Sequence, residues 1–216
     1  SMQYMYAGNP TTQSGTFTMT TISLRSAFES LGDATSGYHS PTFTRFCNSL
    51  DDYRNRVESQ YVGATYPAGT SRAGEEFSPD NGQVNRYSAD VMVPAFLNAY
   101  TNMSGGKLGI FPALSKLLPN WSVNYSGLGK LPWFRDAFKS VTLRHAYRSV
   151  YAVGSYSTYS TFMEYMNGLG FVTDATNGNP IPNSMYNVST VSLNEQFSPL
   201  LGIDLTFLNG LTTKLE

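Results

Sequence analysis

The feature that most constrains this chain is a pair of arms within residues 118–158 in which apolar and polar side chains alternate. The apolar side chains share one parity, the odd-numbered positions: Trp121, Val123 and Tyr125 in the first arm, and Val141, Leu143, Tyr147, Tyr151 and Val153 in the second. The other parity holds Ser122, Asn124 and Ser126, then Thr142, Arg144, Arg148 and Ala152. Successive side chains of a strand point to opposite faces, so each arm is predicted to be a strand with one apolar face. Either a half-buried antiparallel sheet or the wall of a membrane barrel produces this pattern.

A compact turn separates the two arms. Gly127 and Gly129 interrupt the first strand, and Pro132 opens a short helical turn over residues 133–138 that brings the chain back. The sequence therefore predicts an antiparallel hairpin.

The composition suits a sheet whose surface is not strongly ionic. Charged residues are 13% of the 216 residues, and aromatic residues are 14%, with 15 tyrosines. Globular domains usually contain about 25% charged residues. Outer-membrane barrels have this composition, and so do some secreted all-β proteins. The formal net charge of -1 provides no long-range attraction to nucleic acid, so we expect no nucleic-acid partner.

Several familiar kinds of site and segment are excluded. The single cysteine, Cys47, cannot form an internal disulfide, and beside Phe43 and Phe46 it is predicted to be a small buried hydrophobe. With His39 and His145 it gives no metal-ligand spacing, so we expect neither a metal nor another cofactor. No stretch approaches the roughly 18 apolar residues of a membrane-spanning helix.

The two ends of the chain predict a fragment. The opening Ser-Met resembles the remnant of an expression tag, no signal peptide is recognisable, and residues 211–216 stop within an alternating pattern. We therefore expect the chain to be an internal piece of a larger polypeptide.

Helical spacing appears between the first strand and the hairpin. An amphipathic helix is predicted over residues 42–59 from the apolar positions Phe46, Leu50, Tyr53 and Val57. A second helix is predicted over residues 91–100, with Asp90 as its cap, Pro94 near its first turn and Gly105-Gly106 at its end. Residues 110–118 are expected to form a further short helix, and residues 63–88 an exposed loop.

The remaining strands and loops follow from alternation and turn residues. Strands are predicted over residues 16–24, 186–195, 201–207 and 211–215, and Asn209-Gly210 joins the last two by a tight turn. Loops or turns are predicted over residues 1–15, 32–41, 162–185 and 196–199.

Long and short connections alternate along the chain. We divide it into a barrel-wall strand with a leading loop (1–31), a long, partly helical insertion (32–119) and antiparallel strands with one long loop at 162–185 (120–216). The two long connections are predicted to lie at one rim of the sheet, and the turns at 129–138 and 196–199 at the other.

Several runs of the sequence resemble a known family. The main runs are LPNWSVNYSGL at 118–128, LPWF at 131–134 and FKSVTLRHAYRSVYAVGSY at 138–156. Weaker similarity covers SADVMVPAFLNAY at 88–100, FSPLLGIDLTFLNGLTT at 197–213 and LDDYR at 50–54. Together they are similar to the SprA/Sov family, the giant outer-membrane translocon proteins of type IX secretion and gliding motility.

The resemblance implies both a fold class and a passive function. The fold is expected to be mainly β, with antiparallel strands forming a partial arc of a very large transmembrane β-barrel and a long, partly helical loop insertion. A barrel that passes folded cargo must be very large because barrel diameter grows with strand number. The implied location is the bacterial outer membrane at the cell surface. Implied partners are secreted cargo proteins, other secretion-system subunits that plug or cap the openings, and outer-membrane lipid; no enzymatic activity is expected.

The resemblance also implies which side chains face which medium. The residues expected to face the lumen are Asn124, Arg144, Arg148 and Asp204. Those expected to face lipid are Val141, Leu143, Tyr147, Ile203 and Leu205, with Trp121, Trp133 and Phe134 as interfacial aromatics. His145 shares the apolar parity, so either it lies near an interface or a bulge shifts its face.

Other functions are weighed against this one. A Ser-His-Asp hydrolase is disfavoured because no Gly-x-Ser-x-Gly elbow is present, and the adjacent Glu75 and Glu76 do not face each other across a substrate. Arg144 and Arg148 can hold an anion or form a solvated or lumenal face. The rival function is a soluble, aromatic-rich extracellular β domain that binds a protein or a glycan.

Overall fold

The chain is mostly antiparallel β-structure with two helices of more than one turn. The computed structural model describes residues 3–6, 13–30, 32–35, 37–80, 83–101, 103, 109–113, 119–166 and 168–216. Within these residues the strands form open sheets and no closed barrel. Two compact units result: unit 1 comprises Ser1–Met19, Ser23–Lys116 and Ala152–Ser192, and unit 2 comprises Thr20–Ile22, Leu117–Tyr151 and Leu193–Glu216.

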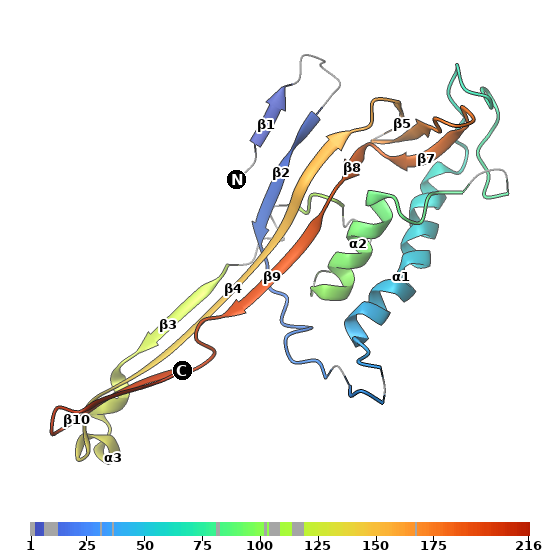
Figure 1. Ribbon diagram of the computed structural model, residues 1–216. Coiled ribbons are helices and arrows are strands. Elements are labelled where there is room, and N and C mark those ends of the chain that lie inside the picture. The colour runs from blue at the N-terminus through green and yellow to red at the C-terminus, as the bar shows by residue number, and fades with distance from the viewer. Residues whose placement is uncertain are drawn as a thin grey trace. The chain divides into compact units, whose positions relative to one another are not determined.

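One long strand organises the larger sheet (Figure 1). The strands of this sheet are β1 Gln3–Tyr6, β2 Gln13–Thr20, β3 Trp121–Tyr125, β4 Phe138–Thr158, β8 Tyr186–Val188, β9 Val191–Phe197, β10 Gly202–Phe207 and β11 Thr212–Leu215. Their order is β1-β2-β4-β10-β11, and β3, β8 and β9 also pair with β4. A second sheet has the order β5-β6-β7, formed by Phe162–Met166, Leu169–Thr173 and Pro180–Ser184. The helices are α1 Pro41–Glu58, α2 Ala89–Tyr100 and the one-turn α3 Pro132–Arg135.

The prediction of α1 over residues 42–59 is confirmed to within one residue at each end. Ser40 has an extended backbone, and its hydroxyl oxygen accepts a hydrogen bond from the N–H of Phe43 at 3.2 Å. Pro41 takes the first helical position, where a missing N–H has no intrahelical partner to lose. The apolar positions that predicted the helix do face the core of unit 1, where Leu50, Tyr53 and Val57 are buried and Phe46 is partly buried.

A carboxylate from outside the helix also holds its first turn. Glu29 accepts a hydrogen bond from the N–H of Thr42 at 3.0 Å and forms an ion pair with Arg45 at 3.0 Å. The hydrogen bond from the Thr42 side chain has the largest influence on the pKa of Glu29 and lowers it. Desolvation raises this pKa, and Arg45 lowers it further. The net result is a lowered pKa, so the charged form of Glu29 is favoured in the folded chain.

The second helix is confirmed, but its start and its proline were predicted wrongly. Ser88, not Asp90, is the N-cap residue, and its carbonyl accepts the N–H of Met92 at 2.9 Å. Asp90 lies inside the first turn, receives a hydrogen bond from the Ser88 hydroxyl, and has its pKa raised by desolvation. Pro94 was expected near the first turn but is buried in the helix interior, because the helix begins two residues earlier than the apolar pattern indicates.

The core of unit 1 forms around Tyr61. The ring of Tyr61 lies 5.5 Å from the ring of Phe77 and 5.5 Å from that of Phe171. Its hydroxyl donates to the carbonyl of Gly170 at 2.7 Å and accepts the N–H of Gly170 at 3.1 Å. Because the side chain is fully buried, desolvation raises the pKa of Tyr61. The insertion 32–119 and the connection 162–185 therefore share one core.

The prediction that residues 162–185 form a loop is wrong, because this stretch contains β5, β6 and β7. Gly170 allows the tight pairing of the first two strands: a Cβ at this position would lie 2.3 Å from the carbonyl oxygen of Met163. The loop predicted over 63–88 is also more ordered than expected, since Thr65 and Glu76 form a β-bridge and Phe77 is buried.

Other boundaries differ from the sequence prediction for local reasons. The loop predicted over 1–15 contains β1 and the start of β2, which pair from Gln3↔Thr16 to Tyr6↔Gln13. The strand predicted over 186–195 is split at Ser189 and Thr190, where Thr190 accepts the N–H of Gly154 at 2.8 Å. That second strand then runs on to Phe197, and residues 198 and 199 exchange hydrogen bonds with Ala146 of β4. The turn predicted over 196–199 is therefore wrong, because the chain continues along β4 into β10.

Part of one prediction falls outside the described residues. Gly105 and Gly106, expected to end the second helix, and residues 114–118 of the expected short helix are among the positions not described. Residues 110–113 are described and are not helical. Phe111 instead packs its ring 5.5 Å from that of Phe17 and 4.7 Å from that of Tyr156.

The central hairpin of unit 2 is confirmed. β3 and β4 pair antiparallel, and the 3-10 turn Gly127–Lys130 together with α3 connects them. The tight turn before β11 is also confirmed: Gly210 has a φ of +87°, a backbone conformation that favours glycine. β10 and β11 pair directly across this turn.

Replacing Tyr61 by Phe is expected to destabilise the protein by about 1–3 kcal/mol, because both backbone groups of Gly170 then stay buried without this partner. Urea unfolding followed by circular dichroism measures the change. Tyr87→Phe is the matched control, since Tyr87 is 71% exposed and should leave the midpoint unchanged. Equal midpoints for Tyr61→Phe and the parent chain would show that this hydroxyl does not support the core.

The lowered pKa of Glu29 predicts a pH-dependent contribution to stability. Such a group stabilises the fold at pH values above its unfolded pKa, and the contribution disappears as the pH falls through its folded pKa. Glu29→Gln should therefore lower the Tm at pH 7 and have progressively less effect below the ordinary range of a glutamate. A difference in Tm that stays constant from pH 7 to pH 3 would contradict this role.

Candidate functional site

The register of unit 2 brings the apolar positions of four strands onto one face of the sheet. Directly paired residues of antiparallel strands point to the same side. The pairs on the apolar face are Trp121↔Tyr147, Val123↔His145, Tyr125↔Leu143, Ile203↔Leu143, Leu205↔Val141 and Ile203↔Leu215. All five side chains predicted to face lipid, Val141, Leu143, Tyr147, Ile203 and Leu205, therefore lie on one face, together with Trp121.

The opposite face is polar along the same strands. Its pairs include Ser122↔Ala146, Asn124↔Arg144, Gly202↔Arg144, Asp204↔Thr142 and Asp204↔Lys214. Asn124, Arg144 and Asp204 thus share one face, and Arg148 has the same parity on β4. The four residues predicted to face a lumen therefore lie on the same face of the sheet.

The apolar face is covered at its centre and open towards its two edge strands. Only 2% of the surface of Val141 and 1% of that of Tyr147 is exposed. Val123 and Tyr125 of β3 and Leu215 of β11 are about half exposed. Unit 2 thus leaves apolar side chains in contact with the medium along both sides of a buried centre.

His145 is held on the apolar face by one specific contact. Its pairing with Val123 lies within an unbroken stretch of the β3–β4 register, so no bulge shifts it to the other face. The imidazole Nδ1–H donates to the carbonyl of Leu200 at 2.6 Å. The rings of Trp121 and Phe197 lie 6.2 and 6.0 Å away. A polar nitrogen is thereby satisfied among aromatic rings.

Aromatic groups mark two levels of this sheet. At one level the ring of Tyr147 stacks on Trp121 at 4.3 Å and contacts Phe197 at 5.1 Å. At the other level Phe138 lies 4.8 Å from Phe207, which a register shift after Thr206 brings opposite it.

The other two predicted interfacial aromatics lie at the second level. The ring of Phe134 packs 6.1 Å from that of Phe138. Trp133, the neighbouring residue of α3, is 87% exposed. Trp121 belongs to the first level, so the three residues occupy both levels rather than one.

The two arginines of the polar face have different surroundings. Arg144 forms ion pairs with Asp204 at 2.7 Å and with Glu216 at 2.8 Å, and Lys214 pairs with the same Glu216 carboxylate at 2.8 Å. Arg148 is exposed, and its side chain forms no ion pair or hydrogen bond with another described residue. The sequence pattern grouped the two arginines, whereas the fold separates them by the position of the carboxylates.

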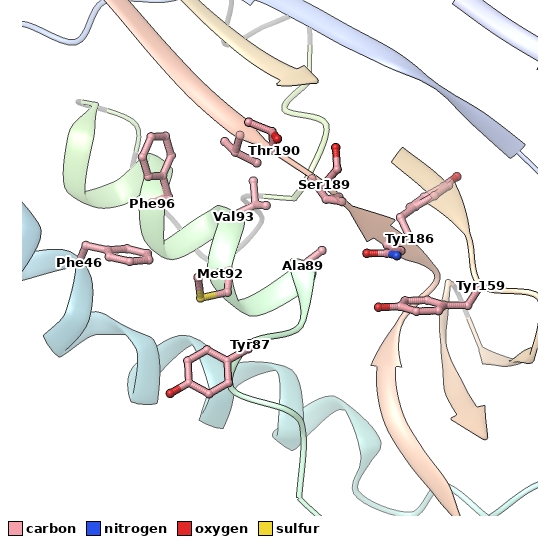
Figure 2. Close-up of a pocket in the computed structure, with 13 residues that line it drawn as sticks. Phe46, Tyr87, Ala89, Met92, Val93, Phe96, Tyr159, Tyr186, Ser189 and Thr190 are labelled. Atoms are coloured by element: carbon pink, nitrogen blue, oxygen red, sulfur yellow. The ribbon is translucent and has the colours of Figure 1, made fainter. Parts of the chain in front are cut away.

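Unit 1 contains a pocket of about 300 Å³, and none of the described residues that line it is charged (Figure 2). Phe46 reaches it from α1, and Met92 and Phe96 reach it from α2. The opposite wall is the stretch from Tyr186 to Val191, with the hydroxyls of Ser189 and Thr190. Tyr87, Ala89, Val93 and Tyr159 complete the described lining. Such walls suit a neutral ligand with apolar groups.

Sequence reasoning missed this pocket. The only local signal is the spacing of Met92 and Phe96, which lie one turn apart on the same side of a helix. Phe46 and Thr190 are far from them in the sequence, and the fold alone brings these residues together.

Two kinds of site are not found in the part of the chain that the structure describes. It contains no group of three or more His, Cys, Asp or Glu side chains arranged to hold a metal ion. Nor do its helices include one with the length and apolar character needed to cross a membrane. Comparison of the sequence with protein-family models and with curated proteins finds no match.

The two faces of unit 2 should contribute differently to its stability. Val141→Ala removes two methyl groups from a buried position and is expected to cost about 1–2 kcal/mol. Asp204→Asn should cost much less, because the ion pair is partly exposed and Glu216 still pairs with Arg144. Chemical unfolding of both variants at low and high salt tests this. A larger loss for Asp204→Asn would mean that the ion pairs hold unit 2 together.

Proposed function

We propose that unit 2 is part of the wall of a protein-conducting β-barrel in the bacterial outer membrane, of the kind that serves type IX secretion and gliding motility. Folded cargo passes through such a barrel without a chemical step, so the protein acts as a conduit and not as an enzyme. The observation that carries the proposal is the register of β3, β4 and β10, which places apolar side chains on one face and Arg144 and Asp204 on the other. A membrane barrel needs both because lipid covers its outside and water fills its lumen.

The spacing of the aromatic levels supports a membrane band between them. Phe138 and Tyr147 lie nine positions apart on β4. At ~3.3 Å per residue this is about 30 Å along the strand. A strand tilted by about 35–45° would then cross roughly 21–25 Å, which matches the apolar band of about 25 Å between the aromatic girdles of outer-membrane barrels. An exposed Trp133 next to one level suits the boundary between lipid and water.

The open sheet edges fit a piece of a larger wall. Among the described strands, β3 pairs only with β4, and β11 pairs only with β10. Backbone groups at such edges are costly in lipid unless further strands pair with them. In a closed barrel, neighbouring strands of the same wall would supply these hydrogen bonds.

The connections between strands support the same topology. The two long connections, 32–119 and 162–185, fold into one unit with a shared core. The connection between β3 and β4 and the turn after β10 are short. Outer-membrane barrels have long loops at one rim and short turns at the other. On this proposal unit 1 is a folded domain formed by the long loops of the barrel.

The partners follow from the proposed function. Secreted proteins pass along the polar face, subunits that plug or cap the openings contact the rim, and outer-membrane lipid contacts the apolar face. The lumen-facing residues are Asn124, Arg144, Arg148 and Asp204. The resemblance of residues 118–156 to the SprA/Sov family also supports the proposed barrel wall, whose other support is the register of the sheet and the spacing of its aromatic levels.

A second candidate function rests on the neutral pocket of unit 1. Its aromatic, methionine and hydroxyl lining suits a soluble module that binds a protein or a glycan through uncharged groups. On this alternative the apolar face of unit 2 would contact another protein instead of lipid.

Cysteine labelling separates the two candidates. Val123 and Asn124 are neighbours on β3, and both are exposed. In a Cys47→Ser background, Val123→Cys and Asn124→Cys are each treated with a charged maleimide after incorporation into lipid vesicles. A barrel wall predicts that position 123 labels at least about tenfold more slowly than position 124, because a charged reagent does not enter hydrocarbon.

Detergent-free protein provides the control for this comparison. If the chain is soluble and monodisperse without lipid, both cysteines should label at similar rates there, since both side chains are exposed. Equal labelling in the presence of vesicles as well, with cooperative melting in plain buffer, would reject the membrane wall and favour the binding module.

A further inference from the structure

Arg148 carries a positive charge that the fold leaves available. It lies four positions from Arg144 on the polar face of β4. Two carboxylates already neutralise Arg144, whereas the guanidinium of Arg148 contacts none of the described carboxylates. If Arg148 only stabilised the sheet, we would expect a carboxylate beside it, as Asp204 and Glu216 lie beside Arg144.

Arg148 lies between two adjoining hollows of unit 2, with volumes of about 500 and 270 Å³. Gln196 lines both hollows as well. The other lining residues of the larger hollow are Asn120, Trp121, Ser122, Ala146, Tyr147 and Ser198, and those of the smaller one are Val150 and Asn194. None of these residues carries a carboxylate, so Arg148 is the one charged group among the described residues that line either hollow.

The neutral lining residues are rich in hydrogen-bond donors. The side-chain oxygen of Asn120 accepts the N–H of Ser149 at 2.8 Å, so the remaining hydrogen-bonding group of this side chain is its NH₂. Gln196 and Asn194 are exposed and bring two further amides, and Ser122 and Ser198 bring hydroxyls. A guanidinium surrounded by amide and hydroxyl donors is complementary to an anion with several acceptor oxygens.

We propose that Arg148, with Gln196 and Asn194 beside it, binds the carboxylate of an aspartate or glutamate side chain in a polypeptide. The planar guanidinium donates two parallel N–H···O bonds to a carboxylate, and the amides supply the remaining donors. Two adjoining hollows accommodate a stretch of chain better than a single small ion. The choice of a polypeptide as the occupant rests on the proposed function, whereas the choice of a carboxylate rests on the charge and the donors alone.

Peptide binding to the purified chain tests this proposal. A short peptide with one glutamate and an uncharged dye is titrated with the protein, and binding is followed by fluorescence anisotropy. The matched peptide carries glutamine in place of the glutamate. The protein variants are Arg148→Gln, Arg148→Lys and, as a charge-matched control, Lys139→Gln, which removes an exposed cation from the same strand outside both hollows.

The expected result is saturable binding of the glutamate peptide. Arg148→Gln and the glutamine peptide should each weaken binding by about tenfold or more, since each removes one partner of a charge-assisted pair. Arg148→Lys should fall between the parent and Arg148→Gln because it keeps the charge but loses the planar fork. Lys139→Gln should bind like the parent.

Three outcomes would overturn the proposal: no saturable binding, equal binding of the two peptides, or equal binding by the parent and Arg148→Gln. Acetate and inorganic phosphate are added as competitors, and displacement by either at the concentration of the peptide would indicate a free-anion site in place of a polypeptide site. The assay contains no lipid, so its failure is distinct from a failure of the proposed barrel, which the labelling of positions 123 and 124 reports.

Discussion

The register between β4 and its neighbours is the constraint on which unit 2 depends. Trp121↔Tyr147 and Ile203↔Leu143 are fixed pairs, and they set which side chains share a face. Side chains alternate strictly along a strand, so a slip of one residue would exchange the two faces. The apolar face, the ion pairs of Arg144 and the two aromatic levels would all be lost together. The register of β4 alone thus gives the sheet one apolar face and one polar face.

The two units bury their apolar side chains in different ways. Unit 1 encloses its own core: Tyr61, Phe77 and Phe171 are fully or almost fully buried, and even the Tyr61 hydroxyl is satisfied within the unit. Unit 2 encloses only the centre of its apolar face and leaves Val123 and Leu215 about half exposed. Exposed apolar side chains gathered on one face of a sheet indicate a further surface that covers them, whether lipid or protein. This difference is the physical reason for proposing that the apolar face of unit 2 contacts lipid.

Sequence periodicity predicted the elements whose burial follows a simple pattern. α1 and the hairpin β3–β4 were found because one face of each is apolar at the period of its own secondary structure. β5–β7 were missed because they are short, contain Gly170 and Pro182, and are held in place by a core that includes Phe171 from β6. Such strands acquire their structure from contacts with residues more than 100 positions away, which no local pattern records.

The same limit applies to the candidate sites. Parity alone grouped Arg144 with Arg148, since the two share a face and differ by four positions. Their chemistry diverges because Asp204 and Glu216 arrive beside Arg144 from β10 and the end of the chain. The neutral pocket is a similar case, built from α1, α2 and β8–β9. Alternation predicts the direction of a side chain, whereas the partner that it meets depends on the tertiary fold.

The charges of the polar face bear on what a conduit wall requires. A wall that passes many different proteins must contact each one, yet release it, so its sites should be few and weak. In the proposed conduit, internal ion pairs would serve this purpose because Arg144, Asp204, Glu216 and Lys214 satisfy one another and leave little net charge for a passing chain. Among the described residues of this face, Arg148 is then a cation without a carboxylate partner beside the paired charges of Arg144. A single exposed guanidinium gives transient contact with acidic residues without the strong retention that a row of unpaired arginines would cause.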